Sequence, residues 1–178
     1  MAKRGPVLVI MLMCLAVQFA SAQTIAQKKQ LRHQLLRAVD DGKTTDSLYK
    51  SLLVIPNRSP LINGYIATLQ ALQAKYSWNP YTKLKQVNNA EKTFDKSITA
   101  DPHNLELRFM RYAVEVQTPK SLDLSAHVNE DKGILIEALR KYPKSDFTKE
   151  TATIARDFLK QNCSCSEEEK QVLENVKI

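Results

Sequence analysis

The chain has 178 residues, of which 43% are hydrophobic, 25% are charged and only four are glycine. This length suits one domain with a sizeable core, and the scarcity of glycine and of β-branched runs argues against a β-rich fold and favours helix. The formal net charge is +7, and without Lys3 and Arg4 it falls to +5.

Residues 1–22 are predicted to be a secretory signal peptide. Lys3 and Arg4 precede an apolar stretch, 7–19, that ends at the small residues 20–22, which is the pattern of a cleaved export signal. The stretch is shorter than the roughly 20 residues of a spanning helix. We expect cleavage before Gln23 and one mature domain, 23–178, without a transmembrane segment; an uncleaved anchor is the alternative. Cys14 follows Met13 rather than a small residue, so a lipoprotein is not predicted.

Export determines how the basic charge is interpreted. An exported protein rarely meets nucleic acid, so we expect no nucleic-acid partner. Two interpretations of the charge remain open, namely a solvated basic surface and contact with anionic envelope polymers or membranes. The lysines form no dense block, which favours the first. We expect the protein in the periplasm, with secretion as the alternative.

Apolar spacing predicts helices along the first half of the chain. The first ends at Gly42, and Asp46 is expected to cap the second. Ser59-Pro60 and Asn79-Pro80 are helix starts, with a cap followed by proline in the first turn. The residues expected to face inward are Leu31, Leu35, Leu36, Val39, Leu48, Leu52, Ile55, Ile62, Tyr65, Ile66, Leu69, Leu72, Tyr76, Tyr81, Leu84, Val87, Phe94 and Ile98.

The second half shows the same helical spacing. Asn104 is expected to cap one helix and Ser145 another, with a polar loop at 118–126 and a short last helix around Leu173. The inward residues are Leu105, Phe109, Tyr112, Val116, Leu135, Ala138, Leu139, Tyr142, Phe147, Ile154, Phe158, Leu159, Val172, Leu173 and Val176. No stretch alternates with period two. The predicted fold class is all-α.

Three helix–proline–helix junctions suggest an internal repeat. They are Leu48-x2-Ser51-x4-Pro56, Phe94-x2-Ser97-x4-Pro102 and Leu135-x2-Ala138-x4-Pro143, and each proline is followed by a potential cap. A large apolar residue, a small residue at a helix crossing and a terminating proline fit helical hairpins that stack on one another. The alternatives are a short solenoid and a compact helical bundle with proline-containing turns.

Ala90-x3-Phe94-x2-Ser97-x4-Pro102 resembles the second helix of a tetratricopeptide repeat, and "RKYPKSDF" resembles the junctions of envelope proteins of that class. The family's first-helix Trp and Gly positions would fall on Ala74 and Trp78, so a degenerate or elongated repeat is expected rather than the standard one of about 34 residues. The run from "AKYSWNPYTKLK" to "DPHNLELRFMRY" also resembles exported helical proteins of Bacteroidota. That resemblance, over about residues 50–160, implies a Gram-negative envelope location and no assigned activity.

No residue pattern indicates a particular reaction. The three histidines, His33, His103 and His127, are far apart and form no metal-binding i, i+4 pair, and neither a phosphate-binding loop nor a nucleophile elbow occurs. We therefore predict no catalytic residue, no metal and no cofactor. Catalysis by scattered residues is the alternative.

Cys163 and Cys165 are the only cysteines of the mature chain. A local structural disulfide is expected. A thiol-redox function of this pair is the alternative, although the following acidic residues, 167–169, oppose the thiolate form that redox chemistry needs.

Aromatic and arginine residues suggest a binding surface. Tyr76, Trp78 and Tyr81 flank one helix junction, and Arg108, Arg111, Tyr112 and Glu115 belong to the next helix. The alternative is that the aromatic residues complete the core and that the arginines pair with acids. The function we expect is a non-enzymatic interaction or scaffold module whose partner is another envelope protein.

Overall fold

The computed structural model describes residues 26–119, 122 and 125–178, and no strand occurs among them. The N-terminal helix spans residues 26–40. It is followed by α2 (Gly42–Leu53), α3 (Pro60–Tyr76), α4 (Pro80–Ala100), α5 (Leu105–Gln117), α6 (Val128–Arg140), α7 (Lys149–Asn162) and α8 (Glu167–Asn175). The all-α prediction is confirmed. The predicted signal peptide, 1–22, lies outside the described residues.

Side-chain caps define the starts of three central helices where the sequence predicted them. Ser59, Asn79 and Asn104 each accept hydrogen bonds from first-turn N–H groups of α3, α4 and α5. Pro60 and Pro80 occupy the first helical position, where a missing N–H group costs nothing.

Two predicted caps were wrong. Asp41, not Asp46, caps α2, because Gly42 begins this helix instead of ending the previous one. Thr148, not Ser145, caps α7 through the backbone N–H group of Thr151. In both cases another capping residue lies three to five positions away, and the local sequence does not distinguish the two candidates.

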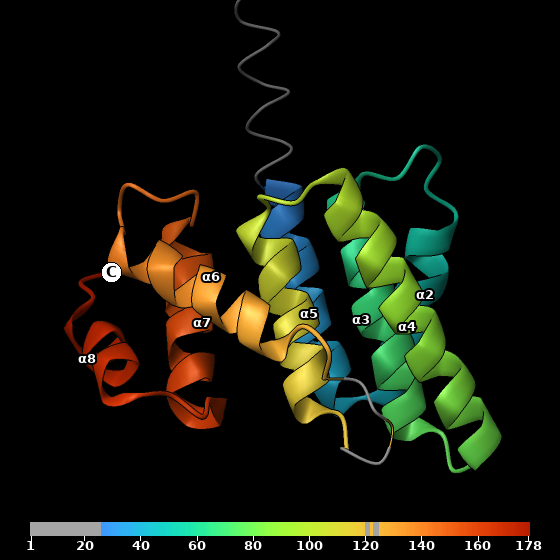
Figure 1. The fold of residues 1–178 in the computed structure, drawn as a ribbon. Helices are drawn as coiled ribbons and strands as arrows, with labels where there is room; N and C mark the ends of the chain where they lie inside the picture. The colour runs from blue at the N-terminus through green and yellow to red at the C-terminus, as the bar shows by residue number, and fades with distance from the viewer. Residues whose placement is uncertain (1–25, 120–121, 123–124) are drawn as a thin grey trace, which may run out of the picture.

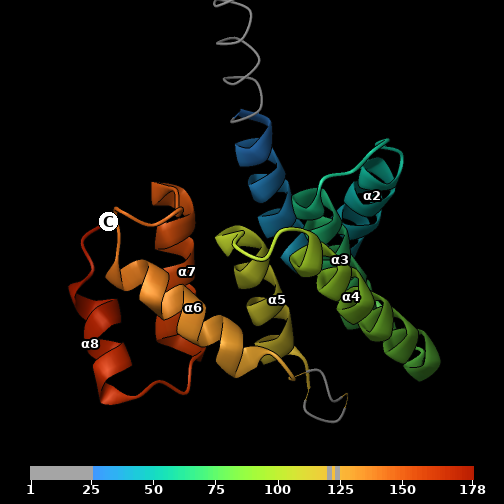
Figure 2. The same cartoon turned by 45° about the horizontal axis from the view of Figure 1, so that its top comes forward.

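The helices form a bundle in which connections alternate between its two ends (Figure 1). The α2–α3, α4–α5 and α6–α7 connections lie at the end where the N-terminal helix starts. The connections from the N-terminal helix to α2, from α3 to α4 and from α7 to α8 lie at the opposite end. The helix α3 contacts α2, α4 and α5, and α5 contacts α6 and α7. Seen from the second direction, α6, α7 and α8 gather on one side of α5, while α2, α3 and α4 gather on the other (Figure 2).

Helix α5 joins two clusters of buried apolar side chains. Leu107 and Met110 belong to the cluster formed with the N-terminal helix, α2, α3 and α4. Tyr112 belongs to the cluster formed with α6, α7 and α8. One helix therefore contributes to both halves of the core.

At the second and third junctions, the large apolar residue and the small residue of the proposed repeat are both buried, as predicted. Phe94, Ser97 and Leu135 are buried, and Ala138 is 8% exposed. The first junction differs, because Ser51 is exposed and its hydroxyl bonds only to the carbonyl oxygen of Leu48 in its own helix. The expected helix crossing at Ser51 was wrong.

Candidate functional site

The aromatic half of the predicted binding surface lies at the α3–α4 turn. Tyr76 is 40% exposed, Trp78 91% and Tyr81 76%. Trp78 lies in the three-residue link between the helices, and Tyr81 in the first turn of α4. The expectation that Tyr76 and Tyr81 face inward was wrong, because both side chains are exposed and that of Tyr76 lies across Gly42 at the surface instead of in the core.

Hydrogen bonds fix the conformation of this turn. The Asn79 side chain accepts bonds from the N–H groups of Tyr81 at 2.9 Å and Thr82 at 3.3 Å. The N–H group of Asn79 donates to the Ser77 hydroxyl at 3.2 Å. The aromatic residues are therefore held on a defined turn rather than on a loose loop.

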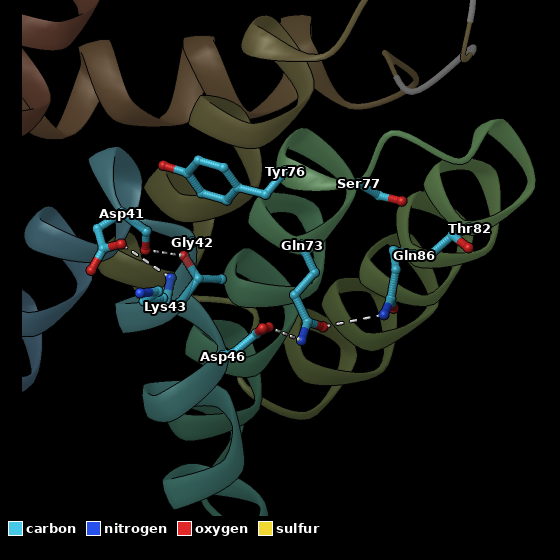
Figure 3. Close-up of a pocket in the computed structure, with 10 residues that line it drawn as sticks. Asp41, Gly42, Lys43, Asp46, Gln73, Tyr76, Ser77, Thr82 and Gln86 are labelled. Atoms are coloured by element: carbon cyan, nitrogen blue, oxygen red, sulfur yellow. Dashed lines mark hydrogen bonds between the residues drawn. The ribbon is translucent and has the colours of Figure 1, made fainter.

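A cleft of about 510 Å³ lies between the start of α2, the end of α3 and the start of α4 (Figure 3). Tyr76 forms an aromatic wall of it. The phenol hydroxyl of Tyr76 donates to the carbonyl oxygen of Val39, and a β-carbon on Gly42 would lie 3.1 Å from its ring. The lining residues are Asp41, Gly42, Lys43, Thr45, Asp46, Gln73, Tyr76, Ser77, Thr82 and Gln86.

The polar wall of the cleft is a chain of side-chain hydrogen bonds across three helices (Figure 3). The Gln73 amide donates to the carboxylate of Asp46 at 2.8 Å, and the Gln86 amide donates to the Gln73 carbonyl at 3.2 Å. Each of these bonds uses one hydrogen of an amide that has two. Each glutamine therefore retains a second N–H group that can bond to a ligand.

Asp41 closes the α2 end of the cleft. Its carboxylate accepts bonds from the Thr44 hydroxyl and from the N–H groups of Lys43 and Thr44. These bonds, that of the Thr44 hydroxyl foremost, lower the pKa of Asp41. Since the carboxylate is used in capping the helix, it has less capacity to bind a ligand than Asp46.

The arginine half of the predicted surface was wrong. Arg108 is 8% exposed and Arg111 4%, and both pair with Asp131, which is fully buried. The distance from Arg108 Nη1 to Asp131 Oδ1 is 2.9 Å, and that from Arg111 Nε to Asp131 Oδ2 is 2.7 Å. The alternative of arginines paired with acids holds, because these side chains lie where α5 packs on α6. Removing Asp131 would take away the fully buried anion of this group and leave the two cations paired only with the more exposed Glu130 and Asp95.

Tyr112 is also interior, with 1% of its surface exposed. Its ring meets Phe158 of α7 edge to face, with centroids 6.1 Å apart. Burial raises the pKa of Tyr112 to about 12. The prediction that it contributes to a binding surface was wrong; it is a core residue, as its helical spacing with Phe109 also indicated.

A second polar cluster joins four helices at the end where the N-terminal helix starts. Arg32 forms two bonds of 2.8 Å to Glu106 of α5 and one of 3.1 Å to Glu150 of α7. The Tyr65 hydroxyl of α3 donates to the same Glu106 carboxylate. Burial and the neighbouring Glu106 raise the pKa of Tyr65. The cluster holds the starts of α5 and α7 against the N-terminal helix.

Cys163 and Cys165 are joined by a disulfide, with their α-carbons 5.2 Å apart. Both are partly buried against the second core cluster, in the turn between α7 and α8. The Lys132 ammonium group of α6 donates to the carbonyl oxygen of Ser164, between the two cysteines, at 3.1 Å.

The histidines do not come together. His33 approaches Glu150, and the His127 ring bonds to Glu115 at 2.9 Å. His103 is exposed in the α4–α5 connection. Among the described residues, no three or more His, Cys, Asp or Glu side chains are grouped so that they could hold a metal ion, and no helix is long and apolar enough to cross a membrane.

Comparison with protein-family models, curated proteins and solved structures finds no match to this chain.

Proposed function

We propose that this chain is an exported, non-enzymatic helical-repeat protein that binds an extended segment of another envelope protein in the cleft between α2, α3 and α4. The observation that carries the proposal is the composition of the cleft walls. An aromatic ring, Tyr76, and side-chain amides that have unused N–H groups line the same cleft. An extended peptide offers carbonyl oxygens to such amides and apolar side chains to such a ring.

The proposed repeat is a set of degenerate tetratricopeptide-like hairpins. Two features support it, namely the contacts of α3 with α5 and of α5 with α7, and the placement of three junctions at one end of the bundle. Alternate helices that contact one another are expected in stacked hairpins. The exposed Ser51 restricts the repeat to the second and third junctions.

A thiol-redox function of Cys163 and Cys165 is the second proposal considered. The partly buried position of the disulfide in a turn fits a structural role better, because thiol exchange requires access for the attacking group. We therefore favour the interaction module.

Site-specific photo-crosslinking in the native envelope tests the cleft. A photoreactive residue at Thr82, which lines the cleft, should capture a partner that the same residue at the exposed position Asn129 of α6 does not capture. The partner identified in this way is then purified and its affinity measured directly.

The double variant Gln73→Ala and Gln86→Ala should weaken that affinity by about tenfold or more, at about 1 kcal/mol for each lost hydrogen bond. Gln117→Ala is the matched control, because it removes an exposed side-chain amide at the end of α5, and it should leave the affinity unchanged. Equal capture at both positions, or unchanged binding by the double variant, would show that the cleft is not the site.

A further inference from the structure

The segment from Ser47 to Ala90 contains no Asp or Glu, although it carries five basic residues, Lys50, Arg58, Lys75, Lys83 and Lys85. Residues 91–178, in contrast, carry 16 acidic and 14 basic side chains. The net positive charge of the described chain therefore lies in its first half, on segment 47–90 and on the N-terminal helix, which carries Lys28, Lys29, Arg32 and Arg37 against the single acid Asp40.

The same segment contains most of the exposed large apolar side chains. Of nine among the described residues, seven belong to it, and four of these lie at or beside the α3–α4 turn: Tyr76, Trp78, Tyr81 and Leu84. Tyr81 and Leu84 are three residues apart in α4 and therefore lie on one face, with Lys85 beside them. Leu84 is 46% exposed, so this outer face is apolar as well as basic.

The position of the turn suits contact with a flat surface. Figures 1 and 2 both show the α3–α4 turn at an extremity of the bundle. Trp78, 91% exposed, is absent from the walls of the cleft, as are Tyr81 and Leu84. Lys75 is held at the same end by a 2.7 Å bond to the carbonyl oxygen of Val39.

We infer that the α3–α4 turn binds an anionic lipid bilayer, with Trp78, Tyr81 and Leu84 entering the interface and Lys83 and Lys85 facing the anionic headgroups. Trp and Tyr are favoured at membrane interfaces because one end of each side chain is apolar and the other polar. Basic side chains add attraction to anionic lipid that decays within a Debye length. A lipid bilayer can take up the protruding Trp78 indole without a preformed pocket. An acidic protein partner would need a complementary pocket for it.

Vesicle binding by the full mature chain tests this inference, and Trp78 is the probe because it is the only tryptophan of the sequence. Vesicles of phosphatidylglycerol mixed with phosphatidylcholine should shift the Trp78 emission to the blue and sediment the protein. Pure phosphatidylcholine should do neither, and salt should reverse the binding. Lys83→Gln with Lys85→Gln should lower the partition coefficient by roughly 25-fold, at about fivefold for each lysine.

The matched control is Lys144→Gln with Lys149→Gln, which removes the same charge from exposed positions near the start of α7 and should change the partition coefficient far less. Trp78→Ala, followed by sedimentation alone, should also weaken binding. The inference is overturned by equal binding to both lipid mixtures, by equal loss in the control, or by unchanged sedimentation of Trp78→Ala. It is also overturned if only poly-glutamate, and not the vesicles, shifts the emission, because the surface then takes an acidic polypeptide. This test does not depend on the proposed cleft.

Discussion

At the scale of single residues, Gly64 lies where α3 packs tightly against α5. A β-carbon at this position would lie 2.2 Å from Leu107 Cδ1 and 3.0 Å from Met110 Cε. Gly133, on the exposed side of α6, has nothing within 4 Å of the corresponding point. The two glycines thus separate the packing effect of a methyl group from its effect on helix propensity.

We predict that Gly64→Ala destabilises the protein by roughly 1–3 kcal/mol, because the Leu107 side chain must move aside and that of Met110 must give by a few tenths of an ångström. Gly133→Ala should stabilise it by about 0.4–1 kcal/mol through helix propensity and a less flexible unfolded chain. Urea unfolding of both variants measures the difference. Equal effects of the same sign would contradict the close approach at Gly64.

The same scale shows what the sequence could and could not predict. Helical spacing correctly predicted that Tyr112 is buried and that Phe109 packs against the second core cluster. It did not reveal that Arg108 and Arg111 are buried, because pairing with Asp131 depends on how α5 packs on α6. One signal was present: Asp131 lies four residues before Leu135 and seven before Ala138, on the predicted inward face. An acid on a core face indicates a buried cation as its partner.

At the scale of helices, spacing and caps predicted where most helices lie but not which apolar residues are buried. Tyr81 and Leu84 have core-like spacing in α4, yet they are exposed because this end of α4 extends beyond its neighbours. The cleft was not predicted, since Asp46, Gln73 and Gln86 come from three helices and share no sequence pattern. Contacts between helices, rather than local propensity, determine both features.

Helix α8 offers a prediction at this scale, because its first turn is closed by a reciprocal capping box. The Ser166 hydroxyl accepts from the N–H group of Glu169, and the Glu169 carboxylate accepts from that of Ser166 at 2.7 Å. This backbone bond, together with a 3.2 Å contact to Lys132, lowers the pKa of Glu169 below its usual 4.5. The carboxylate therefore stabilises α8 fully above pH 4.5, and this contribution is lost as the pH falls through the lowered pKa.

We expect the Glu169 side-chain carboxyl to titrate below 4.5 by NMR, and amide protection in α8 to decline over the same pH range. Glu169→Gln should remove that pH dependence, since the uncharged side chain still accepts the Ser166 bond. Glu168→Gln, whose side chain is 74% exposed, is the control and should retain it. A Glu169 midpoint at or above 4.5 would contradict the assigned capping bond.

At the scale of the whole molecule, α5 and the Arg32 cluster connect the two halves. Leu107 and Tyr112 belong to different core clusters although they are five residues apart in the same helix. Arg32 links the N-terminal helix to Glu106 of α5 and Glu150 of α7. If either half unfolds, the face of α5 that packs against it loses its contacts. We therefore expect the two halves to unfold together.

Two substitutions, one in each cluster, test this cooperativity. Leu107→Ala and Leu139→Ala each remove a side chain with no exposed surface, and each should destabilise the protein by about 2–5 kcal/mol. Because α5 is shared, both variants should lower the midpoint of one transition that circular dichroism and calorimetry report identically. Leu36→Ala is the control, because the Leu36 side chain is 50% exposed, and it should change the midpoint of the transition little. If Leu139→Ala instead produces a separate early transition that leaves α3 and α4 protected from hydrogen exchange, α6, α7 and α8 form an independent unit, and the shared helix does not couple the two cores.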